Sequence, residues 1–233
     1  MERDDAVPLV AARRVRRRTA RDVEGCAGVL AEVHRADGYP MDWPEDPRSW
    51  LTPCSSLASW VAEADGCPVG HVGLSRSGPA DAAPAAWSDR TGRRVEEAAV
   101  VNRLFVAPSA RGHGLGGLLL SRAVRHADGL GLRAVLDVAA HDTAARALYE
   151  SLGWEFLGSV DQWWGPDRRV TVCCYGSVPG ARFSASVARR TGSDPVRPRS
   201  RAESAPFTPT PGGTPGAAAR SAPRSAAPRP RGG

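Results

Sequence analysis

Apolar and polar positions along residues 1–180 change period repeatedly, and this pattern indicates that strands and helices alternate. Two apolar runs joined by the turn pair Asp65-Gly66 predict a β-hairpin. In the first half of the chain we expect strands at Val10–Arg18, Leu57–Ala64 and Val69–Ser75, helices at Arg21–Arg35 and Arg48–Trp50, and a loose loop over residues 78–93.

The second half of the chain alternates in the same way. One helix is expected to stop at Gly129 and Gly131, and Gly153 is placed to cap another. We expect strands at Glu96–Val106, Ala134–Ala139, Phe156–Val160 and Arg169–Gly176, and helices at Gly114–Asp128 and Thr143–Leu152. This order predicts an α/β fold with a mixed sheet of about seven strands flanked by helices. It forms one domain over residues 13–178, after a flexible segment at 1–12.

Charge divides the chain differently. All 31 basic residues are Arg, and ten of them follow residue 180, where only two acidic residues occur. The formal charge of +6 therefore belongs to the end of the chain, which is rich in Pro, Arg, Ser, Ala and Gly. Such a composition buries too little apolar surface to fold, so we expect residues 179–233 to be a disordered tail. A basic arm that contacts nucleic acid, lipid or an acidic protein is one interpretation. A solvated extension without a role is favoured, because aromatic residues are scarce there.

The polar N-terminus and the lack of a long apolar run predict neither a signal peptide nor a membrane span. The five Cys have no metal-type spacing, which suggests free thiols and no metal. We therefore expect a cytoplasmic protein.

The segment Arg111-Gly112-His113-Gly114-Leu115-Gly116 follows an apolar strand and precedes a helix. Glycines let backbone N–H groups approach an anion, and the start of a helix adds partial positive charge, so this layout is typical of a phosphate site. An ordinary strand-to-helix turn is the simpler alternative. The glycines also satisfy the dinucleotide fingerprint, with Asp137 near the ribose position. Five residues, 107–111, separate them from the strand, however, and too little ordered chain follows for a second nucleotide-binding half.

A different pattern fits without a gap. Leu104-Phe105-Val106-Ala107-Pro108, followed by Arg111 to Gly116, resembles the central strand and pyrophosphate loop of the GCN5-related N-acetyltransferase (GNAT) superfamily. The block from Ala144 to Trp154 resembles a later motif of the same superfamily, in the right order and at the right distance. The resemblance implies a mostly antiparallel GNAT sheet and transfer of acetyl from acetyl-CoA to a primary amine by direct attack. A non-catalytic acyl-CoA-binding module of the same fold is the alternative.

The resemblance also implies roles for single residues. Arg111, Gly112, His113, Gly114, Leu115 and Gly116 would hold the pyrophosphate, and Leu104, Phe105 and Val106 the acyl arm. Tyr149 stands where the superfamily has a general acid, although the ring would also fit a helix core. Asp137 is a candidate base. Glu97 and Glu96 are further candidates, and because they point to opposite faces of the expected strand, only one of them can reach the cleft. Alternatively, ordered water deprotonates the amine and no single base exists. Asp142 stands where the superfamily often has an Asn that contacts the cofactor arm, so that contact is lost or replaced.

The acceptor side is less defined. Trp43, Asp161 and Trp163, with nearby acidic residues, suit a cationic amine that has an apolar body, unless the Trp rings merely cover the sheet. The amine substrate is the expected partner. A homodimer and a nucleic-acid contact of the basic tail remain open, and no membrane partner is expected.

Overall fold

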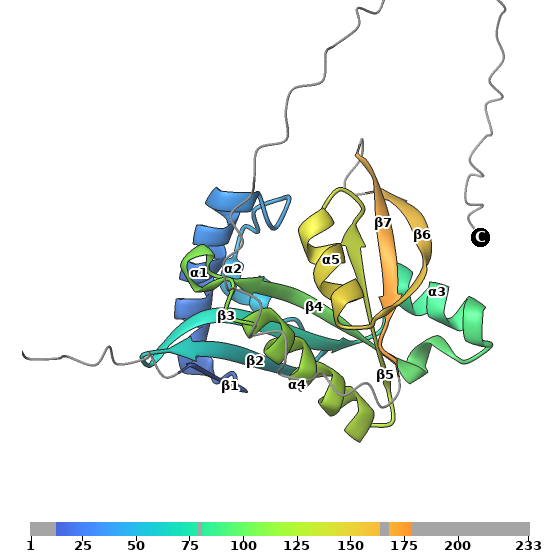
Figure 1. The fold of residues 1–233 in the computed structure, drawn as a ribbon, viewed down its shortest axis with the longest axis horizontal. Helices are drawn as coiled ribbons and strands as arrows, with labels where there is room; N and C mark the ends of the chain where they lie inside the picture. Colours follow the sequence, from blue (N-terminus) through green and yellow to red (C-terminus); the bar gives the residue numbers. More distant parts are fainter. Residues whose placement is uncertain (1–12, 79–80, 164–167, 179–233) are drawn as a thin grey trace, which may run out of the picture. The chain divides into compact units, whose positions relative to one another are not determined.

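The computed structural model describes residues 13–78, 81–163 and 168–178 (Figure 1). The predicted flexible segment 1–12 and the predicted tail 179–233 lie outside the described residues. The strands are β1 (Arg13–Arg17), β2 (Ser56–Ala64), β3 (Cys67–Arg76), β4 (Ala98–Val106), β5 (Arg133–Ala139), β6 (Glu155–Trp163) and β7 (Arg169–Gly176). The helices are α1 (Val23–Asp37), α2 (Pro47–Leu51), α3 (Ala82–Thr91), α4 (Leu115–Gly129) and α5 (Thr143–Ser151), with short 3-10 turns at Ala20–Asp22, Val95–Glu97 and Pro108–Ala110.

The described strands form one seven-stranded sheet in the order β1-β2-β3-β4-β5-β7-β6. Every neighbouring pair is antiparallel except β4 and β5, which run parallel. The predicted mixed, mostly antiparallel sheet is therefore confirmed. The single parallel pair requires a crossover, and α4 supplies it.

The parallel pair separates soon after it forms. β4 and β5 are paired only where Ala98–Val100 faces Arg133–Val135. Beyond Val100, β4 continues beside β3, while β5 continues beside β7. In Figure 1 the two strands run apart, with β5 passing behind α5. The sheet therefore has an opening in its middle, and the facing edges of β4 and β5 have no strand partner there.

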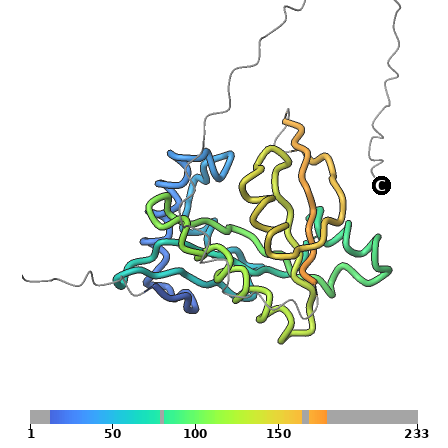
Figure 2. Tube along the Cα trace, in the orientation of Figure 1, coloured from blue at the N-terminus to red at the C-terminus, as the bar shows by residue number. Residues whose placement is uncertain are grey.

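Helices cover the two faces of the sheet, and the Cα trace follows both layers (Figure 2). A Cβ on Gly70 of β3 would lie 3.3 Å from Leu119 of α4. The next residue, His71, contacts Arg18, whose guanidinium also donates to the carbonyl of Leu51 in α2. Successive strand residues point to opposite faces, so α4 packs on one face and α2 on the other. Each fully buried Leu of these helices contributes about 1.5–3 kcal/mol to folding.

Residues 78–93 were expected to be a loose loop, and this prediction is wrong for most of the segment, which forms α3. Pro84 is tolerated because it lies in the first turn, where backbone N–H groups have no acceptor within the helix. Gly92, with φ +68°, ends the helix in the left-handed conformation. The buried Trp87 and Ala83 then pack in one cluster with Val135 of β5.

The central strand begins later than predicted. Residues 95–97 form a 3-10 turn, and β4 starts at Ala98. Glu97 is therefore not a strand residue. Its carboxylate accepts the backbone N–H of Arg94 and pairs with the guanidinium of Arg93, which together lower its pKa. It lies before the first residue of β4, whereas the glycine-rich loop follows the last, so the structure does not bring Glu97 to the opening.

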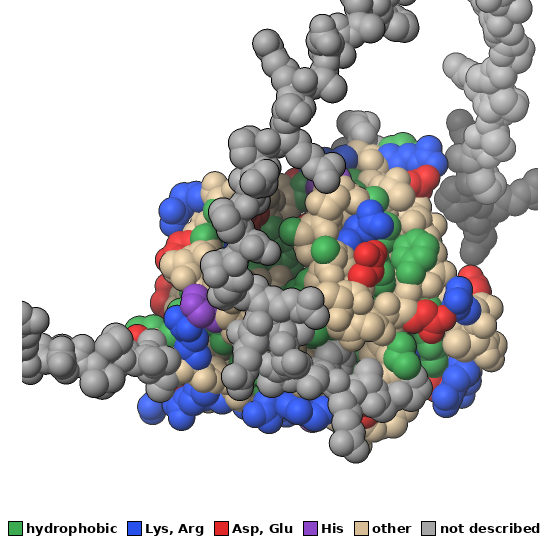
Figure 3. Space-filling model, in the orientation of Figure 1, with side chains coloured by type: hydrophobic (Ala, Val, Ile, Leu, Met, Phe, Trp, Pro, Cys, Tyr) green, Lys and Arg blue, Asp and Glu red, His purple; other side chains and the backbone are tan. Residues whose placement is uncertain are grey.

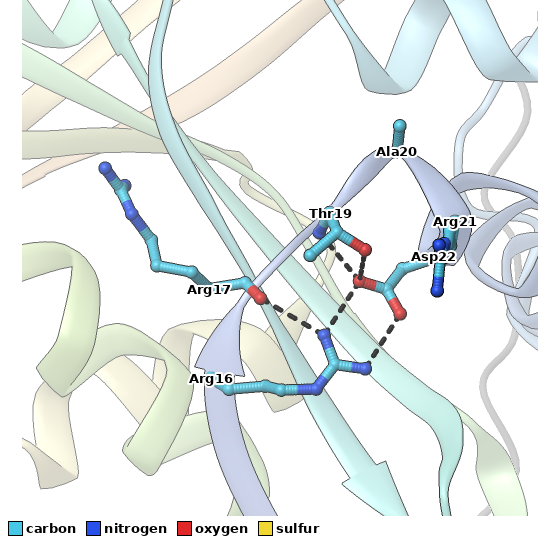
Figure 4. Close-up of a pocket in the computed structure, with 6 residues that line it drawn as sticks. All are labelled: Arg16, Arg17, Thr19, Ala20, Arg21 and Asp22. Atoms are coloured by element: carbon cyan, nitrogen blue, oxygen red, sulfur yellow. Dashed lines mark hydrogen bonds and ion pairs between the residues drawn. The ribbon is translucent and has the colours of Figure 1, made fainter.

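An ion-pair cluster ties β1 to the start of α1. Both terminal nitrogens of Arg16 donate to the Asp22 carboxylate at 2.8 Å, and its Nε donates to Glu63 of β2. Figure 4 shows the Arg16–Asp22 fork. The residues drawn there line a shallow hollow of about 530 Å³. The fork already satisfies the Asp22 carboxylate, so we assign this hollow no ligand.

We expect Asp22→Asn to lower the free energy of unfolding at pH 7 by about 2–4 kcal/mol, because Asp22 is buried and Arg16 would lose its partner. Arg16 holds the pKa of this carboxyl well below its usual value. The contribution is therefore complete above the unfolded-state pKa of about 3.9 and is lost as the pH falls through the folded-state pKa. Urea unfolding between pH 2 and pH 7 measures this. Glu24→Gln, in an exposed pair with Arg48, is the control and should change little.

Candidate functional site

The loop after β4 is built from glycines in a conformation that other residues rarely adopt. Gly112 and Gly114 have φ values of +78° and +73°, and a Cβ on either would meet nothing within 4 Å. Gly114 is also the N-cap of α4. The space beside both glycines is therefore open, and the backbone is accessible to a ligand.

The first turn of α4 offers donors to that space. The backbone N–H groups of Gly114, Leu115, Gly116 and Gly117 have no acceptor within the helix. None of them donates to another group in the described part of the chain. Gly116 also lets α5 approach closely, since a Cβ there would lie 3.3 Å from Leu148. A row of free N–H groups at a helix start matches the chemistry of a phosphate or pyrophosphate.

Arg111 has a partner of its own. Two of its guanidinium nitrogens donate to the Asp37 carboxylate at the end of α1, and its Nε donates to the carbonyl of Val106. The Asp37 carboxylate raises the pKa of this guanidinium. In the structure Arg111 thus joins the loop to α1, and its predicted contact with pyrophosphate stays a prediction. The Nδ1 of His113 lies 3.3 Å from the carbonyl oxygen of Ala110.

β4 has an extra residue just before the loop. His71 pairs with Phe105 and Gly73 with Asn102, so two residues of β4 face one of β3. The extra residue is Arg103, whose φ is +51°. Such a bulge bends a strand and re-aims its side chains. It leaves Leu104, Phe105 and Val106 on the part of β4 that borders the opening.

A buried histidine holds this bulge. Nη1 of Arg18 lies 3.3 Å from Nε2 of His71, so Nε2 acts as acceptor and Nδ1 carries the hydrogen. Nδ1 then donates to the carbonyl of Arg103 at 2.9 Å, and the ring stacks on Phe105 at 5.4 Å between centroids. Burial lowers the pKa of His71 to about 4, which keeps the ring neutral.

Tyr149 projects from α5 with its ring buried against Trp154 and Tyr175. Its hydroxyl makes no hydrogen bond to any described residue, although the neighbouring Tyr175 hydroxyl donates to Glu150. Burial raises the pKa of Tyr149, and the charges of Asp142 and Asp137 raise it further. The phenol therefore stays protonated at neutral pH and has a hydrogen to donate.

Asp137 reaches the opening from the other face of the sheet. It alternates with Leu136, which packs in the same cluster as Tyr149, and it points with Val135 toward α3. Burial raises the pKa of its carboxyl, and the nearby charge of Asp81 adds to this. The charge of Asp137 is one of the smaller causes of the raised Tyr149 pKa, after burial, so the two groups lie near enough to interact.

Asp142 has a role that the spacing alone did not reveal. It is the N-cap of α5, and its carboxylate accepts the backbone N–H of Ala145 at 2.9 Å. Capping by Asp or Asn stabilises a helix by about 1 kcal/mol. Either residue can perform this task, so the replacement of Asn by Asp leaves the helix start intact.

The comparisons with known proteins agree with this geometry. The model of the acetyltransferase (GNAT) family matches residues 30–154, a range that contains the bulge, the loop, Asp137 and Tyr149. The chain belongs to the GNAT family. This confirms the resemblance found in the sequence.

Relatives and solved structures match this GNAT chain to different extents. It is 30% identical over 122 residues to an uncharacterized N-acetyltransferase of Methanocaldococcus jannaschii. The match covers 52% of this chain and 49% of that protein, so it spans about half the length of the relative. The structure of Arabidopsis thaliana NAA60 in complex with acetyl-CoA has a TM-score of 0.54 at 16% identity, covering 71% of this chain and 99% of that one. A ribosomal-protein-alanine N-acetyltransferase from Brucella melitensis gives 0.54 at 20% identity, with coverages of 71% and 99%. These structural likenesses establish the fold.

The residues expected on the acceptor side of this GNAT protein do not form an acidic pocket. Asp161 pairs with Arg169 and accepts the hydroxyl of Thr171, which lower its pKa. Trp43 packs against His34 at 5.1 Å, and Trp163 is 68% exposed. Two of the nearby acids are also engaged, since Asp42 pairs with Arg168 and Asp46 caps α2, whereas the exposed Glu45 has no ion pair with a described residue.

Two more residues lie near the opening: Tyr39, which begins the 39–50 segment expected on the acceptor side, and Arg103, which the sequence analysis did not single out. Tyr39 packs edge-on against Trp50 at 6.2 Å, within electrostatic reach of Arg103, Asp137 and Asp142. Arg103 lies over the Trp50 ring at 4.8 Å. A basic residue inside the apolar run of β4 was the available signal for Arg103. Figure 3 shows a hollow between the surface around α1 and α2 and the surface around α5. Within the described ranges, no helix has the length and apolar character that crossing a membrane requires.

Proposed function

We propose that this chain is an acetyl-CoA-dependent N-acetyltransferase that acts on a primary amine by direct attack. The observation that carries the proposal is the opening between β4 and β5, which has free helix-start N–H groups at one end and the Tyr149 hydroxyl beside it. A fold that hosts acetyl-CoA in other proteins gives this opening a natural ligand. The opening is also where groups from both faces of the sheet meet.

The residues present fit acetyl-CoA, whose thioester supplies the acetyl group. The N–H groups of the segment from Gly112 to Gly117 would hold the pyrophosphate, where a Cβ on Gly112 or Gly114 would occupy the open space. The unpaired edge of β4 at Leu104–Val106 would offer its backbone groups to the acyl arm. These roles belong to the backbone, which explains why few side chains there are polar.

Two side chains would handle protons. The Asp137 carboxylate accepts the proton that an ammonium must lose before its nitrogen can attack. The Tyr149 hydroxyl donates a proton toward the departing sulfur, and its raised pKa keeps that proton in place until it is needed. Substrate would approach Asp137 from the side of α2, while the acyl donor lies toward α4.

The test is to mix the purified protein with acetyl-CoA and a panel of primary amines, and to follow free thiol together with N-acetylated product. Product formation that depends on the amine supports the proposal. Tight acetyl-CoA binding with no transfer to any amine would contradict it and would favour the non-catalytic module.

Replacing Asp137 by Asn should lower kcat/KM by about 10²–10³-fold, as expected for the loss of a positioned base. Its raised pKa means that the carboxylate forms at higher pH than usual, so wild-type activity should rise with pH as Asp137 ionises. That acidic limb should disappear from the variant's pH–rate profile. Asp81→Asn is the control. It removes a neighbouring negative charge and keeps a side-chain oxygen that can accept the backbone N–H of Gly78, so it should keep activity and move the limb to lower pH.

A further inference from the structure

Arg103 is a half-buried cation with an incomplete set of partners. Its Nη1 donates to the side-chain oxygen of Asn102 at 3.0 Å, and its guanidinium lies over the ring of Trp50. Its Nε is enclosed by protein atoms and has no acceptor. Among the described residues, no carboxylate pairs with it. A buried charge without a counter-ion is costly, so this arrangement indicates a missing anion.

A second cation lies near Arg103. Arg18 donates to the carbonyl of Leu51 and to His71, and it too forms no ion pair with a described residue. Burial lowers the pKa of both guanidinium groups, and the charge of Arg18 lowers the pKa of Arg103 further. The charge of Asp22 raises the pKa of Arg18, but the Asp22 carboxylate is itself bound by Arg16. The α2 side of the opening therefore carries uncompensated positive charge.

Negative charge lies across the same space. The pKa of the Tyr39 hydroxyl is raised mainly by burial, is lowered by Arg103, and is raised by Asp137 and Asp142. Tyr39 packs against Trp50, the ring that the Arg103 guanidinium lies over, and the charges of Asp137 and Asp142 act on the same Tyr39 hydroxyl. A ligand bound beside Tyr39 would therefore have both a cation and carboxylates nearby.

We infer that the acceptor is an amine that also carries a carboxylate, as an amino acid does, with its carboxylate bound by Arg103 and its nitrogen placed beside Asp137. The inference rests on the proposed function and specifies its substrate class. A guanidinium offers parallel N–H groups that match the two oxygens of a carboxylate. The bulge positions Arg103, because its carbonyl is fixed by His71, and Nη2 of its guanidinium donates to no described residue.

Three acidic residues once expected to bind the acceptor already have partners, and this favours an acceptor with a carboxylate over a purely cationic one. Asp42 and Asp161 pair with arginines, and Asp46 caps a helix, so none of the three is free for an ammonium. Arg103, in contrast, lacks the partner that it needs. The opening therefore discriminates by an anionic group on the acceptor as well as by its nitrogen.

The experiment compares matched acceptors. The standard L-amino acids, their carboxamides and the corresponding decarboxylated amines are offered with saturating acetyl-CoA, and kcat/KM is measured for each. We expect the best acceptors to be amino acids. Arg103→Gln should lower kcat/KM for them by about 10- to 100-fold, as for the loss of hydrogen bonds to a charged group. The carboxamides should be unaffected. Because each variant is compared on the same amines, their intrinsic reactivities cancel.

Arg125→Gln is the matched control, since this exposed arginine on α4 makes the same change in net charge away from the opening. Arg103→Lys keeps the positive charge and should retain part of the preference for amino acids over carboxamides. It serves as the test variant if Arg103→Gln folds poorly. Calorimetry of the CoA-loaded protein with an N-acetylated amino acid gives a second readout that needs no turnover.

Three outcomes overturn the inference while leaving the proposed function intact: carboxamides acetylated as well as amino acids, equal losses for both in Arg103→Gln, or no binding of the N-acetylated amino acid. Transfer to no amine at all is different, because it contradicts the proposed function itself.

Discussion

Tyr149→Phe should lower turnover by about 10²–10⁴-fold, the usual contribution of a positioned general acid. The substitution keeps the ring that packs on Trp154 and removes a hydroxyl that has no partner among the described residues. Folding should therefore be preserved. The dissociation constant for acetyl-CoA should change little, because the lost interaction matters mainly while charge develops on sulfur. Steady-state kinetics, a melting curve and calorimetry with acetyl-CoA measure the three quantities.

Tyr175→Phe is the control for this experiment. Its ring lies 5.8 Å from that of Tyr149, but its hydroxyl donates to Glu150 and accepts from Arg146. Loss of that hydroxyl should cost about 1 kcal/mol of stability and leave turnover unchanged. The opposite pattern, with Tyr149→Phe turning over normally where chemistry limits the rate, would leave Tyr149 as a packing residue and solvent as the proton donor.

Gly114→Val should weaken acetyl-CoA binding by on the order of a hundredfold or more, equivalent to losing two hydrogen bonds to a charged group. The new side chain would occupy the open space in front of the N–H groups at the start of α4. It would also strain the backbone, because φ is +73° there and a left-handed residue costs roughly 1–2 kcal/mol. Calorimetry with acetyl-CoA and a melting curve separate the two effects.

Gly92→Val is the control for Gly114→Val, because it introduces similar backbone strain at a different place. Gly92 has φ +68° and open space around its Cβ position, but it ends α3, away from the loop. Both variants should lose similar stability, and only Gly114→Val should lose affinity. Equal affinities in the two proteins would remove the loop from the acetyl-CoA site.

The parts of the fold set by local chemistry were predictable. Asp65 and Gly66 both have positive φ, as the hairpin turn between β2 and β3 requires, and the strands on either side follow their apolar runs. Helix α3 was not predictable in the same way, because its Ala and Pro residues give little periodicity. The helix is stabilised by burial of Trp87 against β5 rather than by local sequence preference, and that contact exists only in the folded chain.

The candidate site also contains some residues that local sequence predicts and others that it does not. Tyr149 and the glycines stand out because their types and spacing are unusual. Glu97 was misplaced because a run of residues that looks extended begins with a 3-10 turn that Arg94 and Arg93 stabilise. Asp161 carries the carboxylate that an ammonium group requires, but this carboxylate already pairs with an arginine and is not free to bind a ligand. Its partner Arg169 lies eight residues further along the chain, on β7, and the two side chains meet only when β6 and β7 pair in this register.

The bulge at Arg103 has a consequence for how this protein can change over time. Before the bulge, β4 residues such as Val101 are anchored in the core, while the backbone of Arg103 is held by His71 through a carbonyl that every amino acid possesses. The hydrogen bond that holds the backbone at this position therefore does not depend on which side chain is present. Under the proposed function, position 103 is therefore where libraries for new acceptors should start.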